Sequence, residues 1–114
     1  MEQACIFCRI AAGEADADRV YETGSVLAFR DTNPQAPTHI LIVPKKHIPR
    51  LADLQPEDAA LMGDVVAAAR EVAEQEGVAD GFRLVVNNGR QAGQSVFHVH
   101  FHLLAGRRMA WPPG

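Results

Sequence analysis

The chain has 114 residues, of which 47% are hydrophobic, and a formal net charge of −3. This length allows one hydrophobic core but not two, so we expect a single domain spanning residues 1–114. The negative charge argues against nucleic acid and anionic membranes as partners. The sequence shows neither a signal segment nor an apolar run near the roughly 20 residues that span a bilayer, which predicts a cytoplasmic protein.

The first motif along the chain is a pair of cysteines, Cys5 and Cys8, separated by two residues. A redox dithiol, half of a zinc site and two core thiols are the three interpretations of this spacing. The redox interpretation is the weakest, because only four residues precede Cys5 and a thioredoxin-like motif needs a strand before it. Zinc needs four ligands, and His47 and His98 are the candidates for the other two.

The first half of the chain predicts a short helical turn followed by three strands. The turn covers residues 5–12, and two strands, 20–22 and 26–31, form a hairpin around the turn at 23–25. The prolines of segment 33–37 lack backbone donors, so this segment cannot continue a ladder. The apolar run 39–43 predicts a central strand, which Pro44 ends.

The second half predicts one long helix and two more strands. Pro56 suits the first turn of a helix, Leu61, Val65 and Val72 recur at helical spacing, and Gly77 suits its C-terminal stop. Strands at 82–87 and 97–104 flank a glycine-rich turn that carries Ser95. The sum is an α+β fold, an antiparallel meander of about five strands with one long helix and a short N-terminal helix.

Three histidines alternate along the last predicted strand, at positions 98, 100 and 102. In a strand they would share one face at about 7 Å spacing, twice the rise per residue. A half-solvated sheet also alternates polar and apolar residues, but three imidazoles in register need an anion, a metal or a shared proton to compensate them. Because amides and glycines lie just upstream, the cluster predicts a phosphate site.

Imidazole chemistry fits a reaction at a negatively charged phosphorus, where an uncharged nucleophile is needed. We expect His100 to attack through Nε2, with its Nδ1–H held by an acceptor. Ser95 and the adjacent imidazoles could relay the proton that the departing amine requires, and backbone N–H groups at 93–95 with His102 would stabilise the oxygen charge. This scheme requires no catalytic metal.

The run HVHFHLL at 98–104 is similar to the signature of the histidine triad family. The segments DTNPQAPTH at 31–39, PKKHI at 44–48, GQSVFH at 93–98 and MAWPPG at 109–114 resemble its Hint branch, the histidine triad nucleotide-binding proteins. The resemblance covers nearly the whole chain and implies a histidine triad domain. It also implies a homodimer that hydrolyses adenosine or guanosine 5′-phosphoramidates through a nucleotide attached covalently to histidine.

The resemblance implies a role for each matching residue. His100 is the expected nucleophile, His102 holds the phosphate and His39 lines the site. The expected nucleotide contacts are Asp31 and Thr32 to the ribose, Phe7 and Phe29 to the base, and Asn87, Gly93, Gln94 and Ser95 to the phosphate and leaving group. Cys5, Cys8, His47 and His98 are the expected ligands of a structural zinc, because four protein ligands leave no open position.

A homodimer is also expected from the chain itself, because Ala67, Ala68, Ala69 and Ala73 permit close approach of a second helix and one helix cannot cover both sheet faces. The resemblance implies that the dimer brings Trp111 toward the partner's nucleotide site. Two other functions stay open. One is a nucleotide-binding, zinc-stabilised interaction protein, and the other is a dinucleoside polyphosphate hydrolase, which differs in its leaving group.

Overall fold

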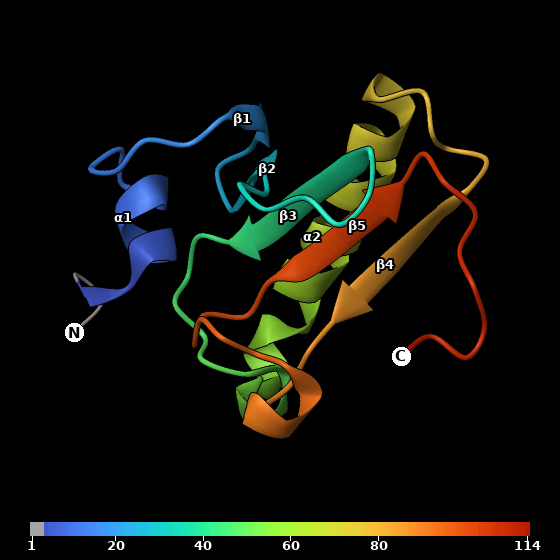
Figure 1. Ribbon diagram of the computed structural model, residues 1–114. Helices are drawn as coiled ribbons and strands as arrows, with labels where there is room; N and C mark the ends of the chain where they lie inside the picture. The colour runs from blue at the N-terminus through green and yellow to red at the C-terminus, as the bar shows by residue number, and fades with distance from the viewer. Residues whose placement is uncertain (1–3) are drawn as a thin grey trace.

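A five-stranded antiparallel sheet with helices on both faces forms the framework of residues 4–114, which a computed structural model describes (Figure 1). The strands are β1 (Arg19–Glu22), β2 (Val26–Arg30), β3 (Thr38–Pro44), β4 (Phe82–Val86) and β5 (Phe101–Ala105). The helices are α1 (Ile6–Ala11) and α2 (Ala59–Gln75), with short 3-10 turns at Leu51–Asp53, Pro56–Asp58 and Arg90–Ala92.

The strand order is β1-β2-β3-β5-β4. The predicted antiparallel sheet with one long and one short helix is confirmed, although the last two strands are exchanged relative to their order in the chain. This exchange places β5 in the interior of the sheet between β3 and β4. Within residues 4–114, β4 pairs with β5 alone and so forms an edge of the sheet.

Helix α2 covers one face of the sheet and shares a hydrophobic core with it. Its residues Val65 and Val72 are fully buried among side chains of β2, β3 and β5. The helix begins at Ala59, not at Pro56, because Pro56–Asp58 forms a 3-10 turn closed by the Asp58 carboxylate, which accepts the Gln55 backbone N–H. Among residues 4–114, no helix has the length and hydrophobicity needed to cross a membrane.

The opposite face is covered by α1, which sequence reasoning did not expect. Phe7 and Ile10 of α1 pack on Leu27, Phe29, Leu41 and Val43 of β2 and β3 in a second hydrophobic cluster. The prediction that one sheet face lacks a cover is therefore wrong for these strands. The alanines 68, 69 and 73 are also buried in the core that α2 shares with its own sheet, and of the predicted set Ala67 alone is exposed.

Strand β5 is shorter than predicted and begins at Phe101. Residues 98–100 lie before its ladder, and the N–H of Val99 donates to the carbonyl of Ile48 at 2.7 Å. The alternation nevertheless continues through this segment, since Val99, Phe101 and Leu103 all join the core under α2. The three histidines that alternate with these residues therefore belong to the face that α1 covers.

Candidate functional site

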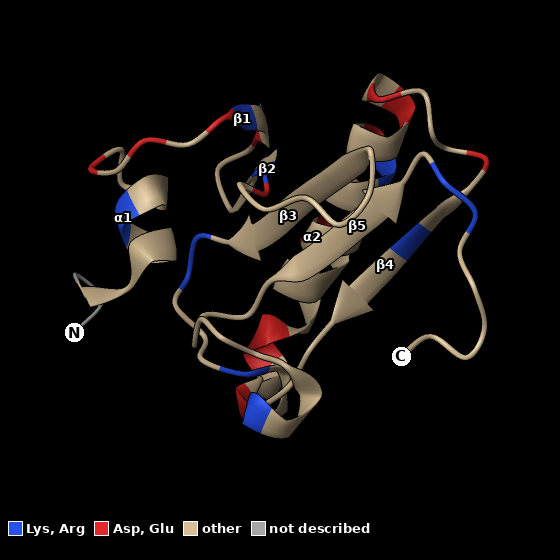
Figure 2. Ribbon diagram, in the orientation of Figure 1, with Lys and Arg blue, Asp and Glu red and all other residues tan. Residues whose placement is uncertain are grey.

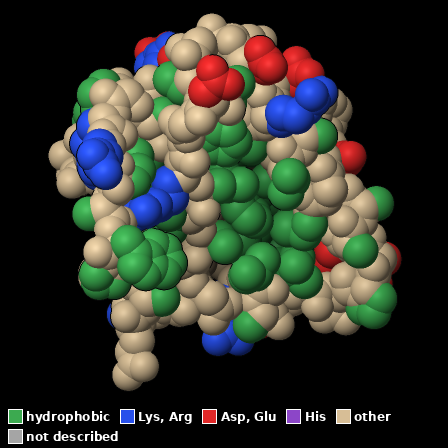
Figure 3. All heavy atoms as spheres, turned by 90° about the vertical axis from the view of Figure 1, so that its right-hand side faces the viewer, with side chains coloured by type: hydrophobic (Ala, Val, Ile, Leu, Met, Phe, Trp, Pro, Cys, Tyr) green, Lys and Arg blue, Asp and Glu red, His purple; other side chains and the backbone are tan. Residues whose placement is uncertain are grey.

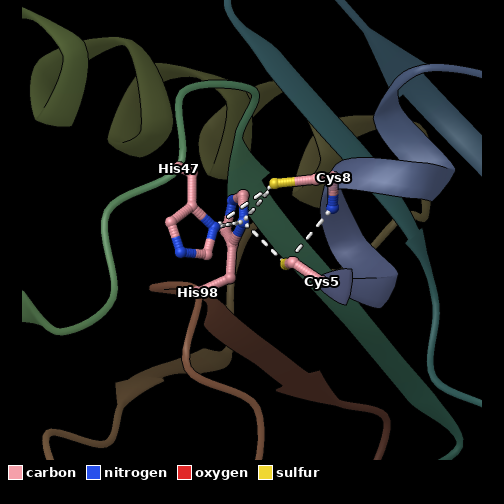
Figure 4. A group of neighbouring side chains, drawn as sticks. All are labelled: Cys5, Cys8, His47 and His98. Atoms are coloured by element: carbon pink, nitrogen blue, oxygen red, sulfur yellow. Dashed lines mark hydrogen bonds between the residues drawn. The ribbon is translucent and has the colours of Figure 1, made fainter. Parts of the chain in front are cut away.

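Four ligand-type side chains converge where α1 meets the segment before β5 (Figure 4). Cys5 caps the N-terminus of α1 and Cys8 lies in its first turn, whereas His47 follows β3. His98 Nδ1 is 3.3 Å from Cys5 Sγ, 3.5 Å from Cys8 Sγ and 3.2 Å from His47 Nδ1. The predicted metal ligands are thus brought together, and we call them the thiol–imidazole cluster.

The chemistry of this donor set fits a zinc ion. Tetrahedral bonds of about 2.0 Å to nitrogen and about 2.3 Å to sulfur place two nitrogens roughly 3.3 Å apart and a nitrogen and a sulfur roughly 3.5 Å apart, close to the separations given above. His98 Nε2–H donates to the Pro44 carbonyl at 2.7 Å, which leaves the Nδ1 lone pair facing the cluster. Such a bond on the far nitrogen is what orients a metal-ligating histidine.

His100 is buried and held in one tautomer. A carbonyl oxygen can only accept, so the 2.8 Å contact between His100 Nδ1 and the His98 carbonyl means that Nδ1 carries the proton. The Phe7 ring packs edge-on against the imidazole, with 5.1 Å between ring centroids. Burial lowers the pKa of His100, so the ring is neutral and Nε2 keeps its lone pair.

A second chain of hydrogen bonds fixes His39 and His102. The backbone N–H of Gln35 donates to His39 Nδ1 at 2.9 Å, so the neutral His39 ring carries its proton on Nε2. His39 Nε2 lies 2.9 Å from His102 Nδ1, which therefore accepts. Burial, with the His100 and His39 rings adding to it, lowers the pKa of His102 to about 4, and the neutral ring carries its proton on Nε2.

Asp31 belongs to both a turn and the histidine group. Its Oδ1 accepts the Asn33 backbone N–H at 2.8 Å, which is the turn role that any aspartate before a proline can have. Its Oδ2 lies 3.4 Å from His39 Nε2. The carboxylate is thus directed toward the imidazoles while it still fixes the turn.

A cavity of about 560 Å³ opens between α1 and β2, beside this group. The predicted base and ribose residues Phe7, Phe29, Asp31 and Thr32 all line it. Its volume lies within the range of small-molecule sites, and its walls are mostly apolar, as such sites usually are. Sequence reasoning missed the other lining residues, which are Ile6, Ile10, Asp16, Ala17, Asp18, Arg30 and Leu41.

The alternation of side chains along β3 could have identified one of these missed residues, Leu41. His39, Leu41 and Val43 alternate along β3, so the identification of His39 as a site residue also places Leu41 on the site face. The register confirms this placement, because Leu41 lies opposite His102 of β5. No periodic pattern marked residues 16–18, which precede β1 in an irregular segment.

The loop before the histidines offers fewer anion donors than predicted. The Gly93 and Gln94 backbone N–H groups donate to the carbonyls of Arg90 and Gly89. The Gln94 side chain is buried and accepts from Gly89 N–H while it donates to the carbonyls of Pro49 and Val96. Within residues 4–114, no hydrogen bond occupies the hydroxyl or the N–H of the exposed Ser95, which leaves both available to a ligand.

The remaining predicted residues lie at the margins of the site. A Cβ built on Gly93 would lie 3.9 Å from the Asn87 side-chain nitrogen, so Asn87 adjoins this loop. Trp111 lies in the C-terminal tail with 81% of its surface exposed. The Arg83 guanidinium of β4 donates to the Ala110 carbonyl at 2.8 Å, which holds the tail beside the sheet edge.

Comparisons with known proteins show which family the chain resembles. The family model described as HIT domain matches residues 12–109. A 14 kDa zinc-binding protein of Zea mays is 50% identical over 111 residues, which are 96% of this chain and 87% of that protein. The structure also resembles a HIT family hydrolase from Legionella pneumophila, with a TM-score of 0.94, 50% identity and coverage of 96% of this chain and 99% of that one.

A third likeness is to a histidine triad nucleotide-binding protein from Candida albicans, with a TM-score of 0.81 and 33% identity. It covers 95% of this chain and 82% of the other. The match to the HIT domain extends over most of the chain and includes all three alternating histidines. The protein therefore belongs to the histidine triad (HIT) family, and the similar solved structures include a hydrolase and a nucleotide-binding protein of that family.

Proposed function

We propose that the protein hydrolyses purine nucleoside 5′-phosphoramidates to nucleoside monophosphates through a covalent nucleotide on His100. The observation that carries this proposal is the tautomer of His100, whose Nδ1–H is bound by the His98 carbonyl. A neutral imidazole with a free Nε2 lone pair can attack a charged phosphorus. The neighbouring cavity supports the nucleoside part, because Phe7 lines it and also packs against the His100 ring.

The reaction then runs in two displacements at phosphorus. His100 Nε2 forms a bond to phosphorus as the bond to the amine nitrogen breaks, and the exposed Ser95 hydroxyl relays a proton from solvent to that nitrogen, so the hydroxyl itself is unchanged. The Nε2–H of His102 donates to a phosphoryl oxygen during this step. Water next attacks phosphorus and gives up one proton to solvent as the bond to His100 Nε2 breaks, which releases the monophosphate and restores the neutral ring.

The thiol–imidazole cluster serves this site structurally. We propose that Cys5, Cys8, His47 and His98 hold one zinc ion per chain, consistent with the name of the zinc-binding relative from Zea mays. The ion would link α1 to the segments after β3 and before β5. Four protein ligands leave no open position for substrate, so the phosphoryl chemistry falls to the histidine side chains.

We also propose that two copies of the chain associate through β4. The turned view in Figure 3 shows hydrophobic side chains gathered on the right-hand side of Figure 1, where β4 forms the sheet edge. Phe82 of β4 is 37% exposed, and Leu84 and Val86 are only half-buried. An unpaired, apolar edge strand is a template for pairing with a second chain, and homodimers are commonly twofold.

Covalent capture tests the proposed function. Purified protein is mixed with an adenosine or guanosine phosphoramidate, quenched in alkali within milliseconds and analysed by intact-protein mass spectrometry. We expect release of the monophosphate and a nucleotide adduct on the wild-type chain, and no adduct on His100→Ala. Nucleotide binding without either product would favour the interaction-protein alternative, whereas turnover of dinucleoside polyphosphates alone would favour the other hydrolase.

A further inference from the structure

The cavity that we assign to the nucleoside has an acidic rim on one side. Asp16 and Asp18, from the segment between α1 and β1, line the cavity together with Arg30 of β2. Figure 2 shows the acidic positions of this segment in red, between α1 and β1. The apolar walls cannot distinguish one purine from another by hydrogen bonds, so any such distinction falls to the polar rim.

Arg30 directs part of its guanidinium to carboxylates of the protein itself. Its two terminal nitrogens each lie 3.0 Å from an oxygen of the Glu76 carboxylate, in a bidentate pair. Its Nε lies 3.6 Å from Asp18 Oδ2. Within residues 4–114, no hydrogen bond engages the Asp16 carboxylate. Besides the N–H groups that Arg30 does not use for Glu76 and the Thr32 hydroxyl, the rim presents the carboxylate oxygens of Asp16 and Asp18, which only accept.

Purine bases differ in what they offer to such acceptors. Guanine presents two adjacent donors, N1–H and the N2 amino group, which a carboxylate can bind in bidentate fashion. Adenine presents its N6 amino group beside the N1 lone pair, so a carboxylate gains one hydrogen bond and faces one repulsive contact. We propose that Asp16 and Asp18 make this cavity select guanine over adenine nucleotides. This inference rests on the proposed function, because it assumes that the nucleoside occupies the cavity.

Calorimetric titration of the zinc-loaded protein with 5′-monophosphates tests the selection, since these products are not turned over. We expect GMP to bind at least roughly fivefold more tightly than AMP, the lower bound for a bidentate base contact. IMP lacks the N2 amino group and should fall between them. In the Asp16→Asn, Asp18→Asn double variant the ratio of GMP to AMP affinity should fall to about one, because an amide offers both a donor and an acceptor.

Glu14→Gln is the matched control. Glu14 lies in the same segment but lines a different cavity with Cys8 and Lys46, so this variant should keep the wild-type ratio. Equal affinity of the wild type for GMP and AMP, or an unchanged ratio in the double variant, would overturn the selection and leave the proposed function standing. Failure of the wild type to bind any of the three nucleotides would overturn the assignment of the cavity itself.

Discussion

His98 and His100 are connected through one backbone carbonyl: the Nδ1–H of His100 donates to the His98 carbonyl at 2.8 Å, while the His98 ring lies in the thiol–imidazole cluster. The side chain that we assign to the metal and the side chain that we assign to the attack on substrate are therefore connected through the backbone of one residue. The cluster, through the backbone of His98, and the Phe7 ring both contribute to the position of the nucleophile.

Replacement of His100 by alanine should abolish turnover while mononucleotide binding remains measurable. The variant loses the attacking nitrogen, but Phe29 and Asp31 still line the cavity. A loss of at least about a thousandfold in kcat is expected for a nucleophile, with a Kd for the monophosphate within a few-fold of wild type. Retention of more than a tenth of the activity by His100→Asn would sink the assignment.

Removal of the metal should lower thermal stability more than intrinsic catalysis. A closed site couples metal binding to folding, whereas His100 is also positioned by the Phe7 ring. Elemental analysis should find one zinc per chain, and calorimetry before and after chelation should show a lower Tm. The Cys5→Ser, Cys8→Ser double variant should lose the metal, and full retention of zinc in it would contradict the site.

Acid should destabilise the protein in a way that depends on His102. The pKa of His102 is lowered from 6.5 to about 4, so between these values the unfolded chain binds a proton that the folded chain does not. Stability from this group is fully present above pH 6.5 and is lost as the pH falls toward 4, by up to about 1.4 kcal/mol per pH unit. Urea unfolding of the wild type and of His102→Gln at pH 7.5 and 5.0 measures this loss of stability. An equal loss in the two proteins would refute the role of His102.

Substitution of Gln94 by methionine should destabilise the fold by about 2 to 4 kcal/mol, because it leaves the Gly89 N–H and the Pro49 and Val96 carbonyls without their partner. Gln94 is buried and connects the loop before His98 to the segment after His47. Denaturant unfolding checks the magnitude, with Gln91→Met on the exposed surface of the same loop as the control. An equally small change in the free energy of unfolding of both variants would refute the structural role of the Gln94 side chain.

Local patterns predicted the elements and marked the Cys5–Cys8 pair, whereas the full set of zinc ligands with His47 and His98 came from the resemblance to the histidine triad family. The prediction that His98, His100 and His102 share one face agrees with the burial of Val99 in the core on the other face, even though the ladder begins only at Phe101. The internal engagement of Gln94 could not be predicted in this way. It depends on where Pro49 lies after folding, and no local pattern records that position.

The same limit applies to the tautomers of the histidines. They depend on single backbone groups, such as the Gln35 N–H at His39 and the Pro44 carbonyl at His98, that tertiary structure brings into place. The cover over the second sheet face was missed for a similar reason. A six-residue helix such as α1 has too short a periodicity to show which face it will occupy.

The C-terminal tail should influence leaving-group choice across a dimer. Trp111 is 81% exposed in the single chain, and the bond between Arg83 and the Ala110 carbonyl keeps the tail beside β4, the strand that we propose to pair with a second copy. Light scattering at micromolar concentration should therefore give twice the 12.4 kDa chain mass, and Phe82→Asp should lower the measured mass.

Truncation before Met109 should keep His100 chemistry but change the ratio of kcat/KM for substrates with small and with aromatic amine leaving groups. A monomeric wild type would defeat the dimer, and an unchanged preference after truncation would defeat the role of the tail.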